Sequence, residues 1–132
     1  TLRKGRPEPE CELHPDTAEA LGVKAGDWVS IETERGRCRQ KVKIFKGIDP
    51  NVVHVQHGWW FPEEDSPDHG NWRSNANALT SMQPPYCSAM GTYQLRALLC
   101  KVLPVEDSEE PWHPDLPENF NSNVAEIQQW DA

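Results

Sequence analysis

Two neighbouring segments with a two-residue alternation of side chains constrain the fold of this chain more than any other feature. In residues 28–34, WVSIETE, aliphatic side chains alternate with polar ones. In residues 38–45, CRQKVKIF, one face carries Cys38, Gln40, Val42 and Ile44 and the other carries Arg39, Lys41, Lys43 and Phe45. Successive side chains of a β-strand point to opposite faces, so this period is typical of half-buried strands. The short RGR stretch between the segments predicts that they form a β-hairpin.

The residues before the hairpin predict one short helix. Residues 14–27, HPDTAEALGVKAGD, offer Asp16 as the N-cap, Glu19 as its capping-box partner and Gly22 as a left-handed end. Residues 1–12 are basic and interrupted by proline, so they predict an extended segment and not a helix.

Two further strands are expected after the hairpin. A KGIDPN turn precedes VVHVQH, residues 52–57, in which Val53, Val55 and His57 share one face of a strand. The apolar residues 96–104, RALLCKVLP, predict a final strand that is buried. The sequence alone therefore indicates a mainly β fold with short helices.

The charge distribution separates a body from a tail. Residues 104–132 contain eight acidic side chains and no lysine or arginine, whereas residues 1–103 contain 13 acids and 13 bases. We expect one domain over 1–103 and an acidic, extended C-terminal tail over 104–132. Ten of the bases precede residue 47, so a long polyanion finds no basic stripe beyond that point and nucleic acid is not an expected partner.

The remaining composition argues against a membrane span and against a zinc site. No apolar run approaches the roughly 18 residues that cross a bilayer, and no targeting segment is visible, so we expect a soluble chain of the cytoplasm or periplasm without membrane insertion. The cysteines at 11, 38, 87 and 100 include no CxxC pair. Free, partly buried thiols are therefore the expected state, with disulfides left open.

The segment from Gly58 to about residue 95 resists assignment to helix or strand. It contains three of the six tryptophans of the chain, a composition that indicates an ordered binding loop and not disorder. In SNANALT, Asn75 and Asn77 are two residues apart and point to one side of an extended backbone. Together with the His57-Gly58 pair, they suit a polar, planar ligand that carries phosphate.

Simpler roles for the same residues stay open at this point. Asn75 and Asn77 are equally suited to Asx-type loop hydrogen bonds. His57 can be a hydrogen-bonded structural histidine, and Trp59 and Trp60 can be core anchors. A Gly-x-Ser-x-Gly elbow, a P-loop and an HExxH motif are all missing from the sequence, so we expect no self-sufficient active site.

Several ordered motifs carry a resemblance to a known family. They are the E-x-HPDTA stretch, G-x-x-x-GDWV, the RG turn of the hairpin, V-x-HGWW and SNANALT, and they run through residues 2–102. The combination resembles the C-terminal dinucleotide-binding domain of the molybdopterin oxidoreductases, the superfamily of dimethyl sulfoxide reductase and formate dehydrogenase.

The resemblance implies a double-psi β-barrel of the aspartate-decarboxylase-like type that grips the molybdopterin guanine dinucleotide of a molybdenum or tungsten enzyme. In the family a strand and a TGR-like turn precede the part that this chain matches, so the barrel is expected to lack its first strand. Carried over to this sequence, the cofactor contacts fall on His57, Gly58, Trp59, Asn75, Asn77, Tyr93, Gln94 and Arg96. Trp60 and Thr80 match the motifs and are expected to pack.

The resemblance also implies what this chain does not supply. The family's metal ligand and iron–sulfur cysteines lie in other domains, so no catalytic residue and no metal ligand is expected among residues 1–132, and no cofactor is expected on the fragment alone. The expected partners are the remaining domains of a prokaryotic parent oxidoreductase. Two alternatives are a stand-alone double-psi-barrel interaction module without cofactor and a tryptophan-based carbohydrate-binding module.

Overall fold

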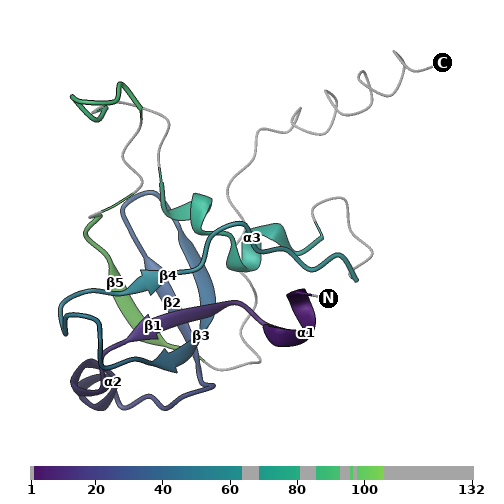
Figure 1. Cartoon of the computed structure of the whole chain (residues 1–132), viewed down its shortest axis with the longest axis vertical. Coiled ribbons are helices and arrows are strands. Elements are labelled where there is room, and N and C mark those ends of the chain that lie inside the picture. The colour runs from purple at the N-terminus through teal and green to yellow at the C-terminus, as the bar shows by residue number, and fades with distance from the viewer. Residues whose placement is uncertain (1, 64–68, 81–85, 93–95, 97, 106–132) are drawn as a thin grey trace.

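The computed structural model describes residues 2–63, 69–80, 86–92, 96 and 98–105, and within them the fold is mainly β. Five strands form one mixed sheet in the order β4-β1-β3-β2-β5 (Figure 1). The strands are β1 Glu10–Leu13, β2 Trp28–Glu32, β3 Arg37–Ile44, β4 His54–Val55 and β5 Lys101–Pro104. The helical elements are α1 Leu2–Gly5, α2 Pro15–Leu21, α3 Asn71–Ser74 and the 3-10 helix η1 Ala76–Leu79.

The predicted hairpin is confirmed. β2 and β3 pair antiparallel, with Trp28 opposite Lys41 and Glu32 opposite Arg37. The turn is closed by Thr33, whose N–H donates to the Gly36 carbonyl at 2.9 Å. Val29 and Ile31 are buried as predicted, but burial does not alternate strictly, because Ser30 of β2 and Arg39 of β3 are buried as well.

Strand β1 is the main element that the sequence did not predict. It pairs parallel with β3, with Cys11 opposite Val42, and antiparallel with β4, with Cys11 opposite Val55. Its burial alternates, since Cys11 and Leu13 are buried while Glu10 and Glu12 are half-buried. The expectation of an extended N-terminal segment is wrong for Leu2–Gly5, which forms α1, and right for the residues that became β1.

Helix α2 is confirmed, with a different N-cap. Asp16 is not the cap: His14 is, and its Nδ1 accepts the Asp16 N–H at 3.2 Å. Pro15 causes the shift, because a proline fits the first helical position, where no N–H is needed. The helix ends as predicted at Gly22, which has a φ of +70°.

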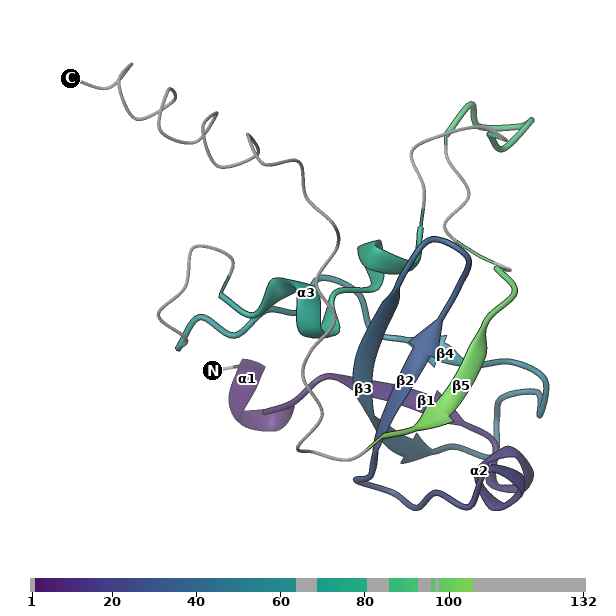
Figure 2. The ribbon, with the colours of Figure 1, turned by 180° about the vertical axis from the view of Figure 1, so that it is seen from behind.

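One core lies on the buried face of the sheet. Its members are Cys11, Leu13, Ala18, Val23, Val29, Ile31, Cys38, Val42 and Leu79. Leu79 comes from η1, far along the chain, so the core extends into the irregular segment. Helix α2 lies at one end of the sheet, and α1 and α3 lie at the opposite end, as the two opposed views agree (Figures 1 and 2).

Two expectations about the outer strands are wrong. β4 has only two residues, and His57 is exposed instead of sharing a buried face with Val53 and Val55, which are half-buried. The final strand is shorter than predicted and mostly exposed, and Leu99, just before it, is 96% exposed. Among the described strands β5 pairs only with β2, so β5 lies at one edge of the sheet.

The sheet is open within the described residues, with β4 and β5 at its edges, so the barrel closure that the resemblance implied is not seen there. Among the same residues, no helix has the length and apolar character needed to cross a bilayer.

Candidate functional site

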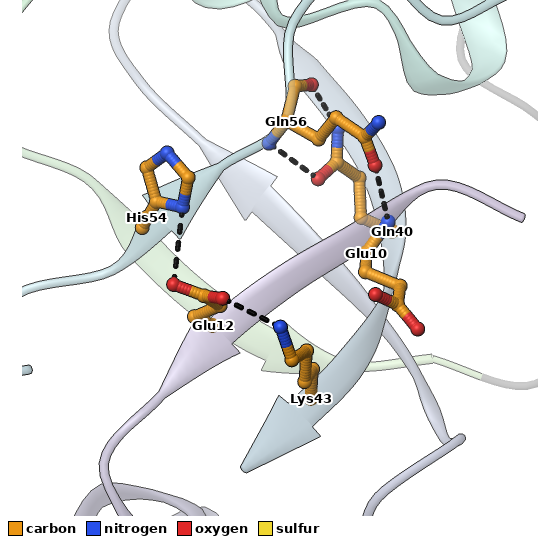
Figure 3. A network of polar contacts seen from close by, with 6 residues as sticks. All are labelled: Glu10, Glu12, Gln40, Lys43, His54 and Gln56. Carbon is orange, nitrogen blue, oxygen red and sulfur yellow. Dashed lines mark hydrogen bonds and ion pairs between the residues drawn. The ribbon is translucent and has the colours of Figure 1, made fainter. Parts of the chain in front are cut away.

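A buried glutamine joins the two segments that carry the predicted site residues. Gln40 lies on β3 with a fully buried side chain. Its Nε2 donates to the carbonyl of Gln56 at 2.6 Å, and its Oε1 accepts the Gln56 N–H at 3.0 Å (Figure 3). The same Nε2 donates to the carbonyl of Ser74 at 3.1 Å. Gln56 directly precedes His57 and Ser74 directly precedes Asn75. The two predicted halves of the site therefore start from carbonyls that share one donor.

We call residues 56–61 the first arm and residues 71–80 the second arm. The second arm is held at its far end as well, because Thr33 Oγ1 donates to the Leu79 carbonyl at 2.9 Å. Both α3 and η1 pack against β3. The hairpin and its turn are thus the rigid support of the second arm.

Aromatic and cationic side chains join the arms at a second place. Trp59 is 8% exposed and meets Phe61 edge to face, with ring centroids 6.5 Å apart. The Arg73 guanidinium lies over the Phe61 ring at 4.5 Å, a cation–π contact between the second arm and the first. The Phe61 N–H donates to the His69 carbonyl at 2.7 Å. Trp59 is therefore a core anchor, one of the simpler roles left open by the sequence.

Asn75 is used by the fold itself. Its Oδ1 accepts the Asn77 N–H at 2.9 Å and caps η1, and its Nδ2 donates to Asn71 Oδ1 at 2.6 Å. The Asx-type role that was open for Asn75 is thus the one that the structure shows. Asn77 is exposed, and its side-chain amide makes no hydrogen bond within the described part of the chain.

His57, Gly58 and Trp60 offer surface to a ligand. His57 and Gly58 are exposed, and Gly58 has a φ of +70°, a left-handed conformation that favours glycine. A Cβ at Gly58 would meet no atom within 4 Å, so the glycine is required by the backbone turn and the space beside it is open. Trp60 is 51% exposed, so about half of its side chain is open to solvent.

The remaining predicted contacts lie at the end of the loop. Tyr93 and Gln94 fall outside the described residues. Arg96 is exposed.

Sequence analysis missed Gln40 and Ser74. Gln40 interrupts the apolar positions of an alternating strand, and a polar residue at a core position is a signal that a partner must exist. Ser74 is fully buried, and its Oγ has no hydrogen-bond partner among the residues that the structure describes.

A charged network lies beside the first arm, on the other face of β1. The Glu12 carboxylate contacts Lys43 Nζ at 2.8 Å and His54 Nδ1 at 3.3 Å (Figure 3). The hydrogen bond from Lys43, helped by the charges of Lys43 and His54, holds the pKa of Glu12 below its usual value. Glu10 belongs to the same strand, and its N–H donates to Gln56 Oε1 at 3.3 Å. Backbone and side chain of Gln56 are therefore both held in place.

The two buried cysteines are poorly suited to redox or metal chemistry. All four are free thiols. Burial raises the pKa of Cys11 and of Cys38 from the ordinary value of 9.0 to about 12, so both stay protonated at neutral pH and are poor nucleophiles and metal ligands. Over the described residues, no group of three His, Cys, Asp or Glu side chains is arranged to hold a metal ion.

A pocket of about 490 Å³ lies elsewhere, against the β1–β3 pair and the Ala25-Gly26 turn. It is lined by Pro7, Glu8, Glu10, Ala25, Gly26, Lys41, Val42, Lys43 and Ile44. Lys41 and Glu8 form an ion pair of 2.6 Å there. It includes none of the predicted site residues, so its size does not make it the candidate site.

The fold and the site together define a class: a mixed β domain that holds two loop segments, rich in amides and aromatic rings, over one end of a hairpin. Comparison with known proteins makes the class specific. The family described as "Molydopterin dinucleotide binding domain" matches residues 1–97. The chain belongs to this family, the dinucleotide-binding domain of the superfamily that includes dimethyl sulfoxide reductases and formate dehydrogenases.

Individual relatives agree with this assignment. Dopamine dehydroxylase of Eggerthella lenta is 34% identical over 113 residues, which cover 84% of this chain and 11% of the relative. Acetylene hydratase of Syntrophotalea acetylenica is 36% identical over 64 residues, 48% of this chain and 9% of the enzyme. The solved acetylene hydratase from Pelobacter acetylenicus superposes with a TM-score of 0.73 at 28% identity, covering 80% of this chain and 15% of that one. This chain thus spans a small fraction of the length of the proteins it matches.

The residues present fit the dinucleotide that the family name implies. Pterin and guanine edges need paired donors and acceptors, which an exposed amide such as Asn77 supplies. A pyrophosphate needs donors such as backbone N–H groups, and Gly58 is exposed with open space beside it. The buried Ser74 hydroxyl, which lacks a partner in the described residues, is a further polar group at the joint between the arms.

Proposed function

We propose that this chain is the molybdopterin-guanine-dinucleotide-binding domain of a molybdenum or tungsten oxidoreductase, with residues 1–103 as the domain and 104–132 as an acidic tail. Its family and its relatives support the proposal, since each relative named above is several times longer than the matched segment. The partners are then the other domains of the parent enzyme, which carry the metal ligand and the catalytic residues.

The fold that we propose for the complete domain is a double-psi β-barrel. The parallel pairing of β1 with β3, across an intervening helix and strand, supports it. The two edge strands, β4 and β5, are where the sheet can be extended by a further strand of the parent polypeptide.

The division of work between the site residues follows from their surroundings. The residues that contact the cofactor directly are the exposed ones of the two arms, His57, Gly58 and Asn77. The site is completed by Tyr93, Gln94 and Arg96. Of these, Arg96 supplies a cation for a phosphate group. Trp59 and Asn75 contribute mainly by fixing the arms, because one is buried and the other caps η1. The cofactor supplies the redox chemistry, and this domain orients it.

The observation that carries the proposal is the meeting of the two arms at Gln40. His57 and Asn75 lie in separate segments of the sequence. Both follow carbonyls that are bound by one amide nitrogen at 2.6 and 3.1 Å. A single extended ligand can then span groups from both arms.

The experiment compares two asparagine variants in the full-length protein that carries this chain. Asn77→Ala removes an exposed amide of the second arm, and Asn51→Ala removes an exposed amide in the turn before β4, outside both arms. Metal content is measured by mass spectrometry, and guanine nucleotide is measured by chromatography after acid release. We expect Asn77→Ala to lower the metal content and the guanine nucleotide content together by about tenfold, the factor that corresponds to the loss of one fairly strong hydrogen bond. We expect Asn51→Ala to change neither content.

Equal cofactor content in Asn77→Ala and the parent protein would contradict the role of the second arm. A parent protein that contains neither metal nor guanine nucleotide would contradict the proposed function as a whole, and would favour the stand-alone module.

A further inference from the structure

Gln40 occupies a position that an aliphatic residue would fill more simply. Its neighbours on the buried face of β3 are Cys38 and Val42, and its partner across the hairpin is Val29. All three are buried. Moving an amide from water into such surroundings costs free energy unless its donors and its acceptor form hydrogen bonds. The residue at position 40 is therefore explained by its hydrogen bonds and not by packing.

Those hydrogen bonds reach two segments that are far apart in the sequence. Gln56 and Ser74 lie 16 and 34 residues beyond Gln40. Both contacts of Nε2 end on main-chain carbonyls, and Oε1 accepts a main-chain N–H. What Gln40 recognises is thus the path of the backbone in each arm, whatever side chains the arms carry.

The hydrogen bonds of Gln40 also mark the point where β4 ends and the first arm begins. A strand continues while its N–H and C=O groups pair with a neighbouring backbone. At Gln56 the main-chain N–H and C=O both bond to Gln40, and β4 stops one residue earlier, at Val55. Gln40 consequently fixes the point at which the chain turns out toward His57 and Gly58.

We infer that Gln40 is the positioning residue of the dinucleotide site: its buried amide sets the separation between the first and second arms, so that His57 and Gly58 on one side and Asn77 on the other meet the same ligand. The inference rests on the proposed function for the identity of that ligand. The contact itself, between a β3 side chain and two loop backbones, is observed in this structure and does not depend on which ligand binds.

Two variants of Gln40 differ in the hydrogen bonds that they remove. Gln40→Met keeps the length of the side chain and removes all three hydrogen bonds. Gln40→Glu, as the carboxylate, keeps an acceptor for the Gln56 N–H and removes the donor to both the Gln56 and the Ser74 carbonyls. Val29→Ala is the matched control, because Val29 is the buried register partner of Gln40 and touches the same layer without bonding to either arm.

Hydrogen–deuterium exchange, read peptide by peptide on the full-length protein, is the first measurement. In Gln40→Met we expect exchange in residues 56–61 and 71–80 to speed up about tenfold, the factor for roughly one net hydrogen bond. In Gln40→Glu both arms lose a hydrogen bond, and we expect the larger increase in 71–80, because 56–61 keeps the bond from the Gln56 N–H. In Val29→Ala we expect any increase to be spread over β2 and β3 and to leave the arms no faster than the hairpin.

Cofactor content is the second measurement, on the same three variants. We expect a several-fold loss of metal and guanine nucleotide in both Gln40 variants and parent-like content in Val29→Ala. The buffer is chosen so that the three variants have the same melting temperature. Equal loss in Val29→Ala and Gln40→Met would reduce Gln40 to an ordinary core residue and overturn the inference. Unchanged exchange in both arms of Gln40→Glu would overturn it too. If the parent protein holds no cofactor, the proposed function fails, while the exchange data still decide whether Gln40 sets the arms.

Discussion

Replacing Asn75 by alanine tests whether this residue belongs mainly to the fold of the second arm. The substitution removes the cap on η1, an acceptor 2.9 Å from the Asn77 N–H, and the 2.6 Å hydrogen bond to Asn71 Oδ1. Loss of a helix cap costs typically about 1 kcal/mol. A half-buried hydrogen bond between neutral amides adds about 0.5–1 kcal/mol. The expected loss of unfolding free energy is therefore about 1–2 kcal/mol.

The assay is urea unfolding of the cofactor-free chain, followed by tryptophan fluorescence, with Asn77→Ala as the control. Asn77 is exposed, and its side chain makes no hydrogen bond among the described residues, so its replacement is expected to change the unfolding free energy by less than about 0.5 kcal/mol. Equal stability of Asn75→Ala and Asn77→Ala would refute the reasoning, because the cap and the Asn71 contact would then contribute nothing measurable.

Three further predictions concern the rest of the domain. Gly22→Ala should cost about 1 kcal/mol of unfolding free energy, because Gly22 ends α2 at a φ of +70°; an unchanged urea midpoint would contradict this. Leu13→Ala, in the fully buried core, should cost about 2–5 kcal/mol, whereas Leu99→Ala, at a side chain 96% exposed, should cost less than about 0.5 kcal/mol. Stability should fall as the pH rises from 9 toward 12, because the unfolded chain loses the protons of Cys11 and Cys38 near pH 9.0 while the folded chain keeps them until about 12. The slope is up to about 1.4 kcal/mol per pH unit for each thiol, and the double alanine variant should lack that part of it.

The elements that could be predicted from the sequence are those with a long local pattern. The β2–β3 hairpin alternates over more than a dozen residues, and Gly22 follows a recognisable helix, so each prediction rested on neighbouring residues alone. β1 was missed because its four residues, ECEL, stand between prolines and its partner β3 lies about thirty residues away. Its burial does alternate, and that weak signal was present in the sequence.

The candidate site shows the same division. The HGWW and SNANALT motifs located the two arms, but local pattern could not distinguish a capping Asn75 from an exposed Asn77. That difference depends on a 3-10 turn whose geometry is set by contacts with β3. Gln40 was invisible as part of the site, because the carbonyls that satisfy its amide belong to backbone positions that no sequence pattern marks.

In the function that we propose, residues 56–61 and 71–80 are two arms of one site that binds a phosphorylated, planar dinucleotide. Hydrogen–deuterium exchange of the full-length protein with and without its cofactor tests this. We expect the cofactor to slow exchange in both arms together and to leave α2 unchanged. Slower exchange in only one arm, or in neither, would contradict it.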